Sequence, residues 1–200
     1  MAVDYHKPRR GQSSGGGAAS AVAIAGPSPA DGVSGWTGAG RRGAIGVGVA
    51  VGVLLALAYP PLGWWPLAIT GWVPLLAWIE VRAVRWQRAL LAGWVAGFLL
   101  HVLVYRFLAF TAVEMSAMPW VLGYVLVGVH AAAMAVHQGA FAAAVAWTQR
   151  PNVGPLRRAA EVGGLLAIAE FALPWLFRWY VGNAFFRAPL WMQAADIVGV

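Results

Sequence analysis

In the middle of residues 43–79, a stretch without a charged side chain, lies Tyr59-Pro60-Pro61-Leu62-Gly63-Trp64-Trp65-Pro66. A helix that crosses a membrane needs about 20 apolar residues, so the stretch is long enough for two passes. The prolines end a helix and allow the chain to reverse, and tryptophan rings favour the boundary between lipid and water. The sequence therefore predicts a tight helical hairpin in lipid, with its turn at one membrane surface.

The composition places the whole chain in the same solvent. Hydrophobic residues make up 60% of the 200 residues, charged residues 10%, and the mean hydropathy is +0.68. A soluble domain carries about 25% charged residues, and this chain has too few to cover a surface facing water. The apolar runs do not alternate with polar residues, which favours helices. We predict an all-α, polytopic transmembrane bundle.

Further apolar segments follow the hairpin, and a different composition precedes it. Residues 1–43 are rich in Gly, Ser, Ala and Pro, a composition that predicts a disordered tail. Two alternatives concern its start: Lys7 to Ala25 faintly resembles a signal peptide, and Met1 could be a start codon assigned too early. We expect a transmembrane domain over 44–200, with five complete spans and the start of a sixth near Pro189. The predicted spans are Ala44–Tyr59, Trp65–Ile79, Ala89–Phe110, Trp120–Trp147 and Ala159–Phe177.

The arginines predict the orientation of the spans. Eight of them precede the first predicted span or lie in the second and fourth connections: Arg41, Arg42, Arg82, Arg85, Arg88, Arg150, Arg157 and Arg158. Basic connections stay in the cytoplasm, so we expect a cytoplasmic N-terminus in a bacterial inner membrane. The Trp64 turn and the loops Thr111–Pro119 and Arg178–Ala188 then lie outside. Although the net charge is +7, the basic residues form no continuous face, which argues against nucleic acid as a partner.

Polar residues in or near the spans are candidates for function, because burying them in lipid is costly: they are His101, His130, His137, Gln138, Glu161 and Glu170. His130 and His137 are too far apart along one helix, about 10 Å, to bind the same metal or haem iron. Hydrogen bonds between helices are the better interpretation for these residues and for His101, and we expect no cofactor. The glycines at 46, 48, 52, 93 and 97 are either faces of close helix contact or glycines of the kind common in membrane helices.

The segment that begins at Glu170 combines aromatic and polar residues near a predicted membrane surface. It contains Trp175, Arg178, Trp179, Tyr180 and Asn183. Pro174 is expected to end or kink the helix there. The segment is either an interfacial anchor or a place where substrate comes close, and Arg178 and Arg187 either bind phospholipid phosphates or extend toward water.

The residue inventory excludes several enzyme classes for this chain. It has no cysteine, no serine between Ser34 and Val200 other than Ser116, and no aspartate beyond Asp31 other than Asp196. A cysteine nucleophile, an intramembrane serine protease and sites built on paired aspartates are therefore excluded. No complete catalytic constellation is present.

Two motifs resemble the apolipoprotein N-acyltransferase family. The first is Leu57-Ala58-Tyr59-Pro60-Pro61-Leu62-Gly63-Trp64-Trp65-Pro66-Leu67, followed by Val73-Pro74-Leu75; the family shows an L-A-F-P-P-x-x-x-W-P-L turn and a V-P-L. The second runs from Glu170-Phe171 through Phe177–Asn183 and Pro189-Leu190 to Gln193-Ala194-Ala195-Asp196-Ile197-Val198-Gly199-Val200, near the family's P-L-x-Q-x-A-D-x-x-G-V. Arg178 stands where the family usually has Pro. The motif positions expected to be structural are Pro60, Pro61, Trp65, Pro66, Pro74, Gln193, Asp196 and Gly199.

The resemblance implies a function that this chain cannot perform alone. Members of the family transfer an acyl chain from a phospholipid to the N-terminal diacylglyceryl-cysteine of a lipoprotein, through a Cys nucleophile, a Glu base and a Lys in a nitrilase-like domain. Here Cys is absent and the only Lys is Lys7. We therefore expect the N-terminal membrane part of such an enzyme, ending before the catalytic domain, inactive by itself. Its partners would be the phospholipid donor, the lipoprotein acceptor and the bilayer.

A second interpretation remains open at the level of sequence. A small polytopic membrane module without enzymatic activity, such as a transporter or an assembly subunit, would show the same composition. A reading frame that continues into a domain with Glu, Lys and Cys favours the acyltransferase, and a stop codon after Val200 favours the module.

Overall fold

A computed structural model describes residues 40–150, 152–172, 181–190 and 193. All of them belong to the second of the two units into which the chain divides, Val33–Val200, and only this unit is considered. Within these residues there are seven α-helices, one 3-10 helix and no strand, which confirms the all-α class. The elements are α1 (Arg41–Leu57), α2 (Leu67–Thr70), α3 (Val73–Arg82), α4 (Trp86–Val104), α5 (Phe107–Ser116), α6 (Trp120–Trp147), α7 (Pro155–Ala172) and η1 (Val181–Arg187).

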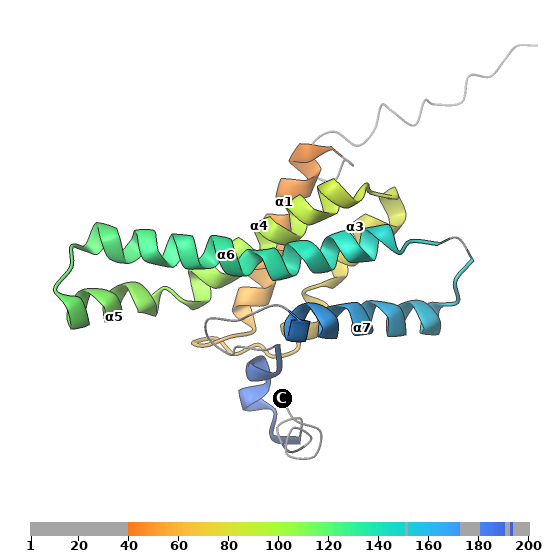
Figure 1. Ribbon diagram of the computed structural model, residues 1–200. Coiled ribbons are helices and arrows are strands. Elements are labelled where there is room, and N and C mark those ends of the chain that lie inside the picture. The colour runs from red at the N-terminus through yellow and green to blue at the C-terminus, as the bar shows by residue number, and fades with distance from the viewer. Residues whose placement is uncertain (1–39, 151, 173–180, 191–192, 194–200) are drawn as a thin grey trace, which may run out of the picture. The chain divides into compact units, whose positions relative to one another are not determined.

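Helix α4 is the centre of the bundle. It packs against α1 on one side and against the long helix α6 on another, while α5 and α7 each lie along α6 (Figure 1). One hydrogen bond between the two central helices runs from Nε1 of Trp94 to the carbonyl of Ala132, at 3.1 Å. Two helices of the described part, α4 and α6, are long and apolar enough to cross a membrane. The expected count of five spans stays a prediction.

The predicted reversal after the first helix is confirmed. Helix α1 ends at Leu57, and the amide of Trp64 donates back to the carbonyl of Leu57 at 3.0 Å, which closes the turn. Trp64 is exposed, as expected for a surface turn, whereas Trp65 is half-buried.

The second arm of the hairpin is not the single helix that we predicted over Trp65–Ile79. It is divided into α2 and α3, with Gly71 and Trp72 between them. The physical reason is Pro74, which has no N–H to donate to the carbonyl of Thr70, so the helical hydrogen-bond ladder is interrupted there.

The third predicted span is also divided. Instead of a helix to Phe110 and a loop over Thr111–Pro119, α4 ends at Val104 and α5 continues to Ser116. Helix α5 ends because Ala117 takes a left-handed conformation (φ 50°) two residues before Pro119, a common way to stop a helix. The helix predicted over Trp120–Trp147 is confirmed with the same bounds as α6.

Glycines allow the helices to approach closely. A Cβ on Gly52 of α1 would stand 2.6 Å from the carbonyl oxygen of Ala96 in α4, and one on Gly97 would stand 2.9 Å from Cα of Ala135 in α6. A Cβ on Gly48 would likewise collide with α4, and a Cβ on Gly93 would collide with α6. The interpretation of these four glycines as faces of close helix contact is confirmed.

A methyl group added to a glycine at a helix contact and one added to a glycine that faces open space should have opposite effects on stability. Gly52→Ala should lower the free energy of unfolding by about 1–3 kcal/mol, because the methyl group would push α1 from α4. Gly128→Ala in α6 meets nothing within 4 Å and should be neutral or stabilise the helix by up to about 1 kcal/mol. Thermal unfolding in detergent, followed by circular dichroism, measures both variants; equal shifts would contradict the close contact.

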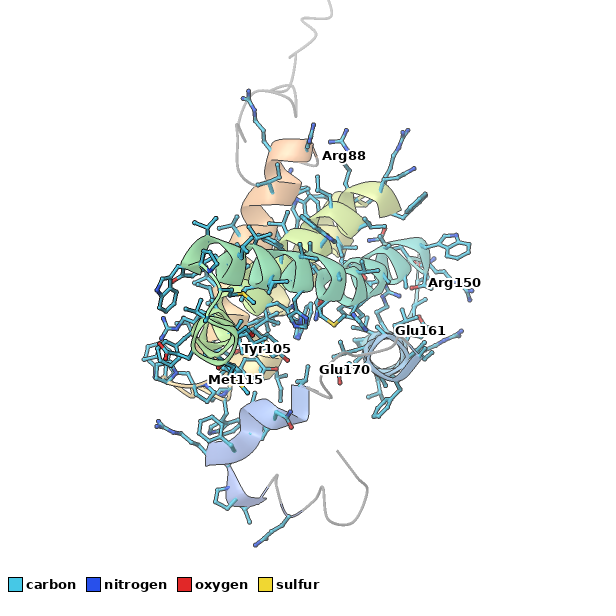
Figure 2. All side chains as sticks on the ribbon, turned by 60° about the vertical axis from the view of Figure 1, so that its left-hand side comes forward. Arg88, Tyr105, Met115, Arg150, Glu161 and Glu170 are labelled. Atoms are coloured by element: carbon cyan, nitrogen blue, oxygen red, sulfur yellow. The ribbon has the colours of Figure 1, made fainter. Side chains whose placement is uncertain are left out.

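Helix ends rich in arginine come together. Nη1 of Arg88 lies 3.9 Å from where a Cβ on Gly40 would stand, so the start of α4 is beside the start of α1. Arg158 of α7 binds Glu80 of α3 and the carbonyl of Val145 in α6. We call the helix ends that carry the eight arginines the basic end; Figure 2 labels two of them, Arg88 and Arg150.

Candidate functional site

The turn of the hairpin contacts η1, far along the chain. Nη1 of Arg187 donates to the carbonyl of Leu62 at 3.1 Å, and the rings of Trp65 and Phe185 lie 5.8 Å apart. Gly63 has a left-handed conformation (φ 63°), and a Cβ on it would stand 2.8 Å from the ring of Phe186. Two segments 125 residues apart are thus joined by contacts that need glycine at this position.

Glu170 fixes the other end of η1. Its Oε1 accepts a hydrogen bond of 3.1 Å from the backbone amide of Val181, the first residue of η1. The first amides of a helix have no partner within the helix, so a carboxylate there both satisfies a donor and stabilises the helix start. Helix α7 therefore positions η1 through the Glu170 side chain.

Behind Glu170 lies a small cavity between the helices. Its free volume is about 20 Å³, which is room for one water molecule. Its polar lining comes from the turn after α1, the α2–α3 connection, α4 and the residue after it, α6 and α7, and consists of Tyr59, Trp72, His101, Tyr105, Gln138 and Glu170. In Figure 2, Glu170 and Tyr105 lie on facing sides of this region.

Buried polar atoms concentrate around the cavity. Nδ1 of His101 donates to the carbonyl of Gly97 at 2.7 Å, so in the neutral ring Nε2 is the acceptor. Among the described residues, Nε1 of Trp72 and Oε1 of Gln138 are buried and have no hydrogen-bond partner. A buried donor and acceptor without partners favour an internal water at this place.

The histidine rings bond within their own helices and also contact rings of neighbouring helices. Nδ1 of His101 and of His137 each bonds a carbonyl one turn back in its own helix, so the hydrogen bonds at these atoms do not join helices. One contact between helices is a ring contact, with His130 of α6 edge-on to Tyr105 at 5.0 Å between centroids, and the expected hydrogen bonds between helices stay a prediction. In the described part of the chain, no three His, Cys, Asp or Glu side chains are grouped as metal ligands would be.

A larger apolar groove runs along α7. Its volume is about 580 Å³, within the range of about 300–1,000 Å³ typical of small-molecule sites. Glu80 and Arg158 line one end and Phe185 and Val181 of η1 line the other. The groove thus leads from the basic end to the contact between η1 and the turn.

The predicted site residues have different positions in the structure. Glu170 and Asn183 are half-buried, at the end of α7 and within η1. Trp65 contacts Phe185, while Pro60, Pro61, Pro66, Pro74 and Gln193 are exposed. Trp175, Arg178, Trp179, Tyr180, Asp196 and Gly199 lie outside the described residues.

Sequence reasoning missed part of the cavity lining. It identified His101, Gln138 and Glu170 as polar residues of the spans, but not Trp72 or Tyr105. No signal in the sequence pairs these two with the others, since tryptophan and tyrosine are common at membrane interfaces. Their convergence follows from the breaks after α2 and α4.

Comparison with known proteins agrees with the motifs. Residues 51–200 match the model of the apolipoprotein N-acyltransferase N-terminal domain. The chain is also 27% identical over 150 residues to an apolipoprotein N-acyltransferase of Bdellovibrio bacteriovorus, an alignment that covers 74% of this chain and 27% of that protein. The chain thus spans about a quarter of the length of this relative. The match to the domain covers most of the chain, including both motifs, and the chain therefore belongs to the apolipoprotein N-acyltransferase family through its N-terminal domain.

Proposed function

We propose that this chain is the N-terminal membrane part of an enzyme that transfers an acyl chain from a phospholipid to the N-terminal diacylglyceryl-cysteine of lipoproteins, the last step of their maturation. The observation that carries the proposal is the contact of Arg187 with Leu62. It joins the two segments on which the resemblance to the family rests, so both contribute to one structural unit.

The proposed setting is the bacterial inner membrane, crossed five times with the beginning of a sixth span and with the N-terminus in the cytoplasm. The grouping of arginines at the basic end supports this orientation, because basic segments remain on the cytoplasmic side. The turn and η1 would then face the opposite side. The predicted tail over 1–43 is too long, because Arg41, Arg42 and Gly43 already belong to α1; for residues 1–39, which lie outside the described part, it remains a proposal.

The proposed role is a platform beside the catalytic domain. The chain contains no cysteine, so the nucleophile of the family's chemistry would come from a part of the enzyme outside it. The groove along α7, which ends at η1, would admit a phospholipid acyl chain sideways from the bilayer. The residues proposed to lie near the substrate stay those predicted from the sequence, Glu170, Trp175, Arg178, Trp179, Tyr180 and Asn183, of which Glu170 and Asn183 belong to the described part of the chain.

The proposal is tested by genetic complementation. The complete gene that encodes this chain should restore triacylated lipoproteins in a bacterium depleted of its own apolipoprotein N-acyltransferase, as measured by mass spectrometry of lipoprotein N-termini. The same frame should encode a domain with Glu, Lys and Cys in that order. Failure to restore acylation by a protein that is present in the membrane would favour the non-enzymatic module.

Glu170 has a specific predicted role as a positioning residue. In the complete enzyme, Glu170→Leu should slow formation of the acyl-enzyme roughly tenfold to hundredfold, because η1 loses the acceptor for the Val181 amide and shifts. Glu170→Gln keeps an oxygen acceptor and should retain most of the activity. The rate of acyl-enzyme formation is measured for both variants, with Gln87→Ala at the basic end as the control. Equal losses in the two Glu170 variants would instead indicate that the carboxylate charge is needed.

A further inference from the structure

A second apolar groove lies on the hairpin itself, between α1 and α3. Its volume is about 430 Å³, and it is lined by Gly46, Val47 and Ala50 of α1 and by residues of α3 from Pro74 to Arg82. The small side chains of α1 keep the groove open, and Trp78 forms part of its wall. This groove is distinct from the one along α7, since the two share no lining residue.

Two arginines stand over one end of the groove. Arg82 is part of its lining, and Arg42 precedes the lining residues Gly46 and Ala50 by one and two helical turns, so it lies on the same face of α1. Both arginines are exposed, and neither forms an ion pair with another described residue. The nearby Glu80 is paired with Arg158, which leaves the positive charge over the groove uncompensated.

The dimensions of the groove fit one leaflet of a bilayer. From Arg42 to Ala50, and equally from Arg82 to Pro74, the helices rise by about 12 Å. The hydrocarbon layer of one leaflet is about 15 Å thick, half of a core of about 30 Å. A chain held in the groove would therefore extend from the headgroup level to near the middle of the membrane.

We propose that the α1–α3 groove binds an anionic phospholipid, with its phosphate between Arg42 and Arg82 and one acyl chain between the helices. The inference rests on the proposed membrane position of the hairpin. Charge complementarity selects this occupant: a zwitterionic lipid would bring its own cation to two arginines, whereas a phosphatidylglycerol headgroup brings a net negative charge. The site is at the basic end, away from η1, so its lipid would be a structural ligand of the hairpin and not the acyl donor.

The test uses the 200-residue chain in nanodiscs that contain equal amounts of phosphatidylglycerol and phosphatidylethanolamine. Native mass spectrometry after transfer to detergent should find phosphatidylglycerol retained in preference to phosphatidylethanolamine. Each of Arg42→Gln and Arg82→Gln should lower this retention about fivefold. Arg106→Gln, which removes an exposed arginine outside the basic end, should leave it unchanged.

A second pair of variants tests the groove independently of charge. Ala77→Leu places a larger side chain into the groove from an exposed position, so it should weaken lipid retention without unfolding the chain. Ala133→Leu makes the same change at an exposed position of α6 that lines none of the grooves, and it should have no effect. Circular dichroism confirms that each variant is folded.

Equal retention of the two lipids would overturn the inference, and so would unchanged retention in the Arg42→Gln, Arg82→Gln double variant. Displacement of the lipid by soluble glycerol phosphate would also overturn it, because it would indicate a phosphate site without a role for the acyl chain. The readout needs no acyl transfer. Selective lipid retention together with failed complementation would therefore refute only the proposed function, and the reverse combination would refute only this site.

Discussion

Arg158→Met is expected to lower the free energy of unfolding by about 2–3 kcal/mol. The guanidinium is largely buried, with 16% of the side chain exposed, and it holds three helices together. Nη2 lies 2.6 Å from Oε1 of Glu80 in α3 and 2.8 Å from the carbonyl of Val145 in α6. Methionine fills the space of the aliphatic stem but leaves both acceptors without this donor, and the part-buried carbonyl of Val145 is the costly one, since the Glu80 carboxylate is 42% exposed.

The neighbouring residue supplies the matched control. Arg157 is 68% exposed and pairs only with Glu161 one turn along the same helix, a contact worth about 0.3–0.5 kcal/mol. Thermal unfolding in detergent should therefore show Arg158→Met melting about 5–10 °C below the wild type, and Arg157→Met within about 2 °C of it. If the two variants lose the same stability, the α3–α6–α7 contacts do not depend on Arg158.

Local signals in the sequence predicted those elements that depend on neighbouring residues. The bounds of α6 follow from Pro119 at its start and a run without Asp, Glu, Lys or Arg to Trp147, after which the basic segment begins. The turn follows from the Pro-Pro-Leu-Gly run. The spacing of the glycines made close helix contact one of two interpretations, and the structure decides between them. In each case the information lies within a few residues of the feature.

The missed features depend on contacts between distant segments. The break after Val104 has no proline or glycine, so hydropathy alone continued the helix to Phe110; in the structure Tyr105 instead turns its ring to His130 of α6. The cavity next to Glu170 likewise requires six elements to converge, α1, α2, α4, α6, α7 and η1. The sequence motifs named Glu170 as a site residue, but its bond to Val181 spans a segment whose path cannot be inferred from composition.

The absence of natural cysteines makes the contact between the turn and η1 directly measurable. Spin labels on Leu62→Cys and Leu190→Cys, two exposed positions on either side of this contact, should report a narrow distance distribution in the otherwise unchanged chain. Gly154→Val, in an open connection where a Cβ meets nothing, should preserve it.

Gly63→Val should broaden that distribution and, in the complete enzyme, lower acyl transfer at least tenfold. Valine is strained at φ 63°, a conformation that costs about 1–3 kcal/mol for residues other than glycine. Its side chain would also occupy the space of the Phe186 ring and of Cδ of Arg187, 2.8 and 3.0 Å from the new Cβ. Phe186 is exposed and can move away, but Arg187 would then lose the carbonyl of Leu62, and η1 would keep the bond to Glu170 and the ring contact of Phe185 with Trp65. An unchanged distance distribution, with normal acyl transfer, would show that the two family motifs touch without depending on each other.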